Sequence, residues 1–249
     1  MIRAELIKLK RSATWVVAVV LPVVAVVTGT LNLANNRETL DAGWASFTSQ
    51  VVLFYGLLFY SLGVGILAAT VWRVEHRGGA NWNLLASTTP RLLNLITAKI
   101  VAIALPVLIM QVVLVVGTYV SGIIVLRLPG QPPWELAVVG ALATVAALPL
   151  ISVQSLLSML LRSFAAPIAL CLAGCVAGIA AVTSTDLRPL SYVIPQALNT
   201  RALNLGSTAL AGSDGLNLVD ATQILGIAAV LTTLAVLATV LAIKSVKLR

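Results

Sequence analysis

Charged residues are scarce in this sequence. Aspartate, glutamate, lysine and arginine make up 10% of its 249 residues and hydrophobic residues 59%, whereas a soluble domain has about 25% and about 45–50% of these classes. The composition therefore excludes a soluble globular protein and predicts an integral membrane protein. On a soluble chain the net charge of +8 would suggest nucleic-acid binding, but here we assign it to membrane topology and expect no nucleic-acid partner.

The residues that build common catalytic and metal sites are also few. The one histidine, His76, lies in a basic loop where a solvated side chain is expected, and the two cysteines, Cys171 and Cys175, lie in an apolar run. Neither a disulfide framework nor a metal site follows from that pattern. No glycine is followed by lysine and no Gly-x-Ser-x-Gly occurs, so the sequence lacks the phosphate-binding loop of ATPases and the nucleophile turn of serine hydrolases. We expect no catalytic residue, metal or cofactor in this chain.

Six long stretches of the sequence contain no charge at all. Each exceeds the ~20 residues that a helix needs to cross about 30 Å of hydrocarbon, so we predict an all-α bundle of six transmembrane helices in a single membrane domain, residues 1–249. These spans lack the ionisable relays of ion-driven carriers, which excludes that energy source. The expected spans are about 14–33, 46–72, 99–126, 136–161, 165–183 and 221–243.

The distribution of charge between the loops predicts how the chain is inserted. Six spans place both termini on one side of the membrane, and that side then carries twelve of the sixteen basic residues. Basic residues gather in cytoplasmic loops. We therefore expect cytoplasmic N- and C-termini in the inner (plasma) membrane.

The segment 72–99 connects the second and third expected spans on the cytoplasmic side. Gly78-Gly79 ends the preceding helix, and residues 80–87 favour a short helix. The apolar side chains of that short helix are Trp82, Leu84 and Leu85. We expect a folded contact element for a partner; the alternative is an amphipathic helix that rests on lipid.

Polar side chains interrupt the third and fourth expected spans. Gln111 follows Pro106 in span 3, and Pro149 precedes Gln154 and Ser155 in span 4. Prolines beside amides and hydroxyls are one way in which bundles place polar groups at membrane depth, so Gln111, Gln154 and Ser155 are candidates for a substrate path. Hydrogen bonds between helices account equally for the same residues.

Three further segments complete the predicted architecture. Residues 2–11 favour an amphipathic helix in the headgroup layer, which either passes movement into span 1 or only fixes orientation. Gly174 and Gly178 favour close helix packing, within one subunit or across a dimer. The segment 184–221 holds apolar stretches too short to span, so interfacial or re-entrant structure is expected.

Together these features resemble the ABC-2 type permeases, in particular the compact six-span subunits of bacteriocin and antibiotic export or immunity systems. The resemblance rests on the basic segment 1–11, on the loop from Glu75 through Leu84-Leu85-Ala-Ser-Thr-Thr-Pro-Arg91 to Lys99, and on the semi-apolar segment before span 6. It implies a permease that pairs with a second copy or a sister permease and binds two copies of a separate ATP-binding cassette ATPase, which binds the ATP.

The resemblance also implies roles for individual segments. Residues 80–87 would form the coupling helix that docks on the ATPase, the N-terminal segment would be the interfacial connecting helix, and residues 184–221 the re-entrant extracellular helices. The implied ATPase contacts are Glu75, Arg77, Trp82, Leu84, Leu85 and Arg91.

The function expected from these features is the permease subunit of an ABC exporter in the cell membrane. Its substrate would be amphipathic or hydrophobic, such as a peptide antibiotic, a drug or a lipid-like molecule, because the spans hold no charge for a strongly ionic cargo. A different interpretation is an ATP-independent membrane scaffold or channel that recruits another cytoplasmic partner through residues 72–99.

Overall fold

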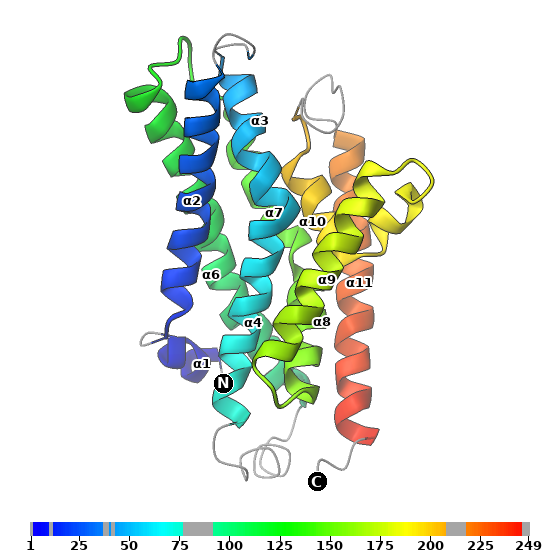
Figure 1. Ribbon diagram of the computed structural model, residues 1–249. Coiled ribbons are helices and arrows are strands. Elements are labelled where there is room, and N and C mark those ends of the chain that lie inside the picture. Colours follow the sequence, from blue (N-terminus) through cyan, green and yellow to red (C-terminus); the bar gives the residue numbers. More distant parts are fainter. Residues whose placement is uncertain are drawn as a thin grey trace.

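The protein is a bundle of long helices that stand side by side (Figure 1). The computed structural model describes residues 2–9, 12–36, 40, 43–76, 92–207 and 218–245. Within this part of the chain all regular elements are helical and six of the helices are long and apolar enough to cross a membrane, which confirms the predicted six-span, all-α fold. In chain order they are Thr14–Asn35, Trp44–His76, Leu93–Val125, Glu135–Leu160, Ala165–Thr183 and Leu218–Ile243.

Several of these spans consist of more than one regular element. Span 1 is α2 (Thr14–Asn35), span 5 is α9 (Ala165–Thr183) and span 6 is α11 (Leu218–Ser245). The other three are divided. Span 2 consists of α3 (Trp44–Phe54), η1 (Tyr55–Phe59) and α4 (Tyr60–His76), span 3 of α6 (Leu92–Val120) and η2 (Ser121–Val125), and span 4 of α7 (Glu135–Ala146) and α8 (Leu148–Leu160).

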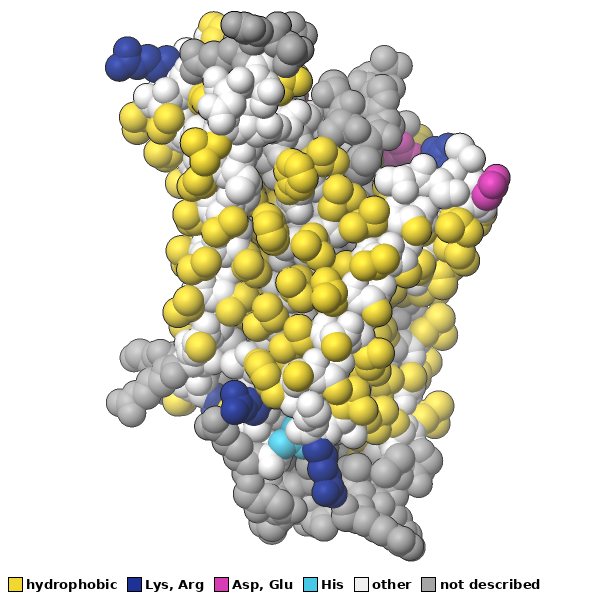
Figure 2. Space-filling model, in the orientation of Figure 1, with side chains coloured by type: hydrophobic (Ala, Val, Ile, Leu, Met, Phe, Trp, Pro, Cys, Tyr) yellow, Lys and Arg dark blue, Asp and Glu magenta, His cyan; other side chains and the backbone are white. Residues whose placement is uncertain are grey.

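The core of the bundle is built around span 2. About 61% of the most apolar window of spans 2 and 4 is buried, against 22% for span 6, so the outer spans leave most of their surface free for lipid. The four largest side chains that are wholly buried, Trp72, Tyr55, Tyr60 and Phe47, all belong to span 2. On the outside, hydrophobic side chains cover the middle of the bundle and the charged ones lie toward its two ends (Figure 2).

A short helix, α1 (Ile2–Leu9), lies across one end of the bundle beside α4 and α6 (Figure 1). The indole Nε1 of Trp15 donates a hydrogen bond to the carbonyl oxygen of Leu9 at 2.9 Å, which fixes the turn from α1 into α2. We call this end of the bundle the α1 end. The last turn of α4, the first turns of α6 and the turn between α8 and α9 lie at the same end.

The π-helical turn η1 in the middle of span 2 was not predicted from the sequence. A π turn leaves a backbone carbonyl without its usual helical donor, and such turns occur often at functional positions. Here the hydroxyl of Thr200 donates to the carbonyl oxygen of Gly56 at 2.7 Å. The donor comes from a distant part of the chain, so the residues around Gly56 do not by themselves predict the turn.

Thr200 belongs to α10 (Pro195–Leu203), a helix too short to span a membrane. This helix, α10, follows η3 (Arg188–Tyr192) and is buried against α9, α7 and span 2. A side chain at Gly174 would overlap the amide of Gln196, and a Cβ at Gly178 would lie 3.0 Å from the backbone nitrogen of Ala197. The two glycines therefore serve close packing within the subunit, the first of the two predicted alternatives. The expectation of interfacial or re-entrant structure for 184–221 stays a prediction about the membrane.

Candidate functional site

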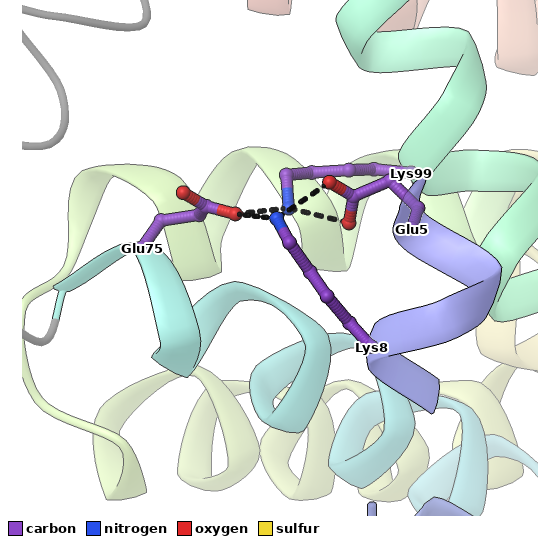
Figure 3. A network of polar contacts seen from close by, with 4 residues as sticks. All are labelled: Glu5, Lys8, Glu75 and Lys99. Carbon is purple, nitrogen blue, oxygen red and sulfur yellow. Dashed lines mark hydrogen bonds and ion pairs between the residues drawn. The ribbon is translucent and has the colours of Figure 1, made fainter. Parts of the chain in front are cut away.

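Four charged side chains meet at the α1 end, where three helices converge (Figure 3). Glu5 and Lys8 come from α1, Glu75 from the last turn of α4, and Lys99 from α6. Lys8 Nζ lies 2.8 Å from Glu5 Oε1 and 2.9 Å from Glu75 Oε1. Lys99 Nζ lies 3.1 Å from Glu5 Oε2 and 2.9 Å from Glu75 Oε1. Each ammonium group thus contacts both carboxylates, and we call the four residues the ionic network.

The network is largely removed from solvent. The side chain of Lys99 is 0% exposed and those of Glu5 and Glu75 are 7% and 5% exposed, while Lys8 is 41% exposed at the edge. The Lys99 ammonium also lies 4.9 Å from the centre of a Trp72 ring, which adds a cation–π contact. Two carboxylates and two ammonium groups balance, so the charges compensate one another; the removal of one partner from such a set costs about 3–5 kcal/mol.

The local sequence explains how α1 presents its two charges. Glu5 and Lys8 are three positions apart, which places them on one face of the helix. Partial burial alone lowers the pKa of Lys8, but the hydrogen bonds and charges of Glu5 and Glu75 outweigh it and raise this pKa above its ordinary value of 10.5. Because the folded pKa is the higher one, the stabilisation from Lys8 is fully present below the unfolded pKa and is lost as the pH rises through the folded pKa.

The network closes around the predicted contact loop. Glu75 is two positions before residues 77–91, and Lys99 lies about 10 Å along α6 from Leu92 at 1.5 Å per residue. The two helices that flank those residues, α4 and α6, are therefore joined to each other and to α1 through ion pairs. Separating the three helices would leave largely buried charges unpaired.

The structure places only part of the predicted contact set. Glu75 is buried in the network, and its contact with the ATPase stays a prediction. The other five predicted contacts, Arg77, Trp82, Leu84, Leu85 and Arg91, and the coupling helix 80–87, lie outside the described residues. Their role stays a prediction.

The network itself was not predicted from the sequence. Glu5 was expected in an amphipathic helix and Lys99 at the start of the third span, and Lys99 is in fact fully buried. One signal was available: Glu5 and Glu75 are the only two acidic residues on the side that carries twelve basic ones, and both belong to the network. The expectation for His76 also needs correction. Instead of being solvated, it is half-buried at the end of α4, with Nε2 2.7 Å from the carbonyl oxygen of Ser158.

The predicted substrate-path residues lie inside the bundle. Gln111, Gln154 and Ser155 are each at most 2% exposed. Gln111 lies beside the buried tyrosines Tyr55 and Tyr60, yet neither of its amide atoms meets a partner at hydrogen-bonding geometry, and the same is true of Gln154 Oε1 and Ser155 Oγ among the described residues. Gln111, on span 3, lies against two tyrosines of span 2, so the bridging of helices stays an alternative and the substrate path stays a prediction.

The fold and this site define a class of protein: a multi-pass helical membrane protein whose buried ion pairs gather beside one interhelical loop. Residues 1–178, from α1 through most of α9, match a family described as ABC-2 family transporter protein. The chain belongs to this family and is a membrane permease component of an ABC exporter, which confirms the resemblance noted from the sequence. Comparisons with curated proteins and with solved structures find no match.

Proposed function

We propose that this permease moves an amphipathic or hydrophobic substrate across the inner (plasma) membrane, driven by ATP hydrolysis in a separate ATP-binding cassette subunit. The substrate class is a peptide antibiotic, a drug or a lipid-like molecule. Family membership supports the ABC partnership, and the scarcity of charge within the spans supports an apolar cargo. The observation that carries the proposal is the ionic network, which joins both ends of residues 77–91 to α1.

The coupling step follows from that arrangement. The α1 end faces the cytoplasm, and the ATPase docks on residues 77–91. When ATP binding closes the ATPase, the loop is pushed, and α1, α4 and α6 move as one unit because their separation would expose buried charges at a cost of about 3–5 kcal/mol. Spans 1, 5 and 6, which are the least buried, are available to lipid and to a second permease copy or a sister permease.

The inward-facing amides and hydroxyls give the cargo a neutral polar lining. Gln111, Gln154 and Ser155 hold side-chain atoms without hydrogen-bond partners among the described residues, and such atoms gain from a passing polar group. An amphipathic molecule offers such groups together with apolar surface. A strongly ionic one would find no counter-charge there.

A single aromatic substitution tests the docking assignment. Trp82→Ala, in the predicted coupling helix, should lower co-purification with the ATPase at least about tenfold, because buried aromatic anchors contribute about 2 kcal/mol or more to an interface. ATP-driven uptake of a labelled amphipathic peptide antibiotic into inside-out vesicles should fall with it. Trp134→Ala is the matched control, since Trp134 is 67% exposed at the start of α7, at the opposite end of the bundle.

Two results would overturn the proposal. Unchanged co-purification and uptake in Trp82→Ala would remove the docking assignment. Uptake that persists with an ATPase unable to hydrolyse ATP would favour the ATP-independent channel.

A further inference from the structure

A second concentration of polar groups lies at the α1 end, on the other flank of the last turn of α4. A cavity of about 300 Å³ opens there between α4, α8 and α9. The last turn of α4 thus supplies Glu75 to the ionic network and two of its neighbours to this cavity. The lining residues are Ala69, Arg73, His76, Ser158, Leu161, Arg162, Ser163, Phe164 and Pro167. Figure 2 shows basic and histidine side chains together below the hydrophobic middle of the bundle.

The charge of this cavity differs from that of the network. Two arginines, Arg73 and Arg162, and His76 line it, and none of the nine lining residues is acidic. The Arg73 guanidinium lies 4.9 Å from the centre of the Phe164 ring, which holds it at the cavity wall. A planar guanidinium donates paired hydrogen bonds that match a phosphate group. The cavity therefore favours an anion such as a phosphate.

Neutral donors in the lining point to the same ligand. The Ser158 side chain is buried, at 3% exposed, and its hydroxyl meets no hydrogen-bond partner among the described residues. Its backbone carbonyl already accepts from His76 Nε2, so the hydroxyl is the group left to serve a ligand.

The surroundings of the cavity indicate a ligand with an apolar tail. Phe164 lines the cavity and is 37% exposed, and Leu160 and Leu170, each within three positions of a lining residue on α8 or α9, are 42% and 48% exposed. At about 300 Å³ the cavity is at the lower end of the ~300–1,000 Å³ of small-molecule sites, which suits a headgroup better than a whole drug-sized molecule. A phosphate in the cavity would pair with the arginines, and acyl chains along α9 would cover the exposed leucines.

We propose that this cavity binds the phosphate of an anionic phospholipid from the leaflet at the α1 end. A basic pocket between spans at such a depth is suited to an anionic headgroup. The lipid would join α4 to the turn between α8 and α9, on the flank of α4 opposite the network. This site requires neither the ATPase nor a cargo, so its failure would leave the permease assignment intact.

The test measures lipid retained by the purified full-length protein, by native mass spectrometry. Phosphatidylglycerol and phosphatidylcholine with identical acyl chains are offered in equal amounts. We expect wild type to retain phosphatidylglycerol preferentially. Arg73→Gln with Arg162→Gln should lower that retention about 30-fold, since each basic residue near a membrane surface contributes about 1 kcal/mol toward an anionic lipid and 1.4 kcal/mol is tenfold. The control pair, Arg127→Gln with Arg188→Gln, removes two exposed arginines elsewhere and should change nothing.

Further variants keep the test decisive if the double variant folds poorly. Ser158→Ala deletes one hydroxyl and should lower retention about fivefold, the effect of one hydrogen bond. Arg162→Gln alone, in an exposed turn, should show an intermediate loss. Equal retention in the test and control pairs would overturn the site.

Competitors separate the possible sources of the phosphate. Inorganic phosphate and soluble glycerophosphoglycerol should fail to displace the lipid, because neither has an acyl chain. Displacement by inorganic phosphate would mean a simple anion site and would overturn the lipid assignment. Loss of ATPase co-purification in the arginine pair, with lipid retention unchanged, would reassign the cavity to protein docking.

Discussion

Two short helices dock on this bundle, and they are held in opposite ways. α1 is attached by four ionised side chains, with ammonium and carboxylate groups 2.8 to 3.1 Å apart. α10 is attached by close backbone approach at Gly174 and Gly178 and by neutral hydrogen bonds such as that from Thr200 to Gly56. Isolated helices of eight or nine residues are unstable in water. Each of the two helices therefore depends on its contacts with the bundle.

The difference follows from where each helix lies along the bundle. α1 is at the end, where Lys8 still reaches solvent and a balanced set of charges is tolerated. α10 is enclosed by α9, α7 and span 2. An ionised group would be costly there, so close fit between the helices holds α10 instead. The ionic network can separate only if charges are exposed, which suits helices that must move as a unit. The close contacts at Gly174 and Gly178 leave little room for an added side chain, which suits a helix that stays in place.

The largest effect on stability is expected from Lys99, the buried cation of the ionic network. Lys99→Met leaves Glu5 and Glu75 near each other with only the half-exposed Lys8 beside them. The unfolding free energy should fall by about 3–5 kcal/mol, measured as a lower melting temperature or as loss of monodisperse protein in detergent. The double variant Glu75→Gln with Lys99→Met removes a whole ion pair and should recover part of the loss. If Lys99→Met melts like the exposed-site control Arg188→Met, the charges do not hold α1.

A smaller effect on stability is expected at Gly178, where α9 contacts α10. In Gly178→Ala the new Cβ would lie 3.0 Å from a backbone atom of α10, which cannot yield as a side chain can. We expect a loss of about 1–3 kcal/mol, typical of overpacking, measured by thermal unfolding. Gly226→Ala is the matched control, because no atom lies within 4 Å of its Cβ position on α11, and no loss is expected there. Equal melting of the two variants would show that α10 is not tightly docked.

The smallest effect is expected from the solvent-exposed member of the network. Lys8→Met removes an ion-pair partner that is 41% exposed, so we expect a cost of about 1 kcal/mol or less at neutral pH. Because its neighbours raise the pKa of Lys8, wild type should lose this advantage only as the pH rises above the ordinary lysine value of 10.5. Melting curves from neutral to alkaline pH would show the difference shrinking. A difference that is constant with pH would mean that Lys8 stabilises through its methylene groups.

The sequence predicts the fold well because the six spans depend on local composition. Charge-free runs longer than a bilayer specify helices whatever their neighbours are, and the short N-terminal helix follows from its own periodicity. The divided span 2 could not be predicted in this way. Its π turn depends on the hydroxyl of Thr200, which lies 144 positions from Gly56.

The candidate site is predicted less completely for the same reason. Glu75 was named from its place beside the loop, but its partners Lys8 and Lys99 lie 67 and 24 positions away from it and meet it only in the folded chain. From the sequence alone, a lysine at the start of an apolar run, such as Lys99, fits an interfacial anchor as well as a buried ion. Only the positions of Glu5 and Glu75 in the folded chain distinguish the two cases. The path residues Gln111, Gln154 and Ser155 were found because amides and hydroxyls in a span are visible locally.

The most direct test of the coupling proposal asks whether α1 and α6 travel together. Glu5→Cys with Lys99→Cys removes one acid and one base, and of the four ion pairs it keeps the Lys8 to Glu75 pair at 2.9 Å. The native Cys171 and Cys175 are replaced by alanine. A short bis-methanethiosulfonate joins the new cysteines, and ATP-driven uptake is measured before and after reduction. If the two helices move as one unit, the cross-linked protein transports as well as the reduced one. Transport that is abolished by the cross-link and restored by reduction would contradict that motion.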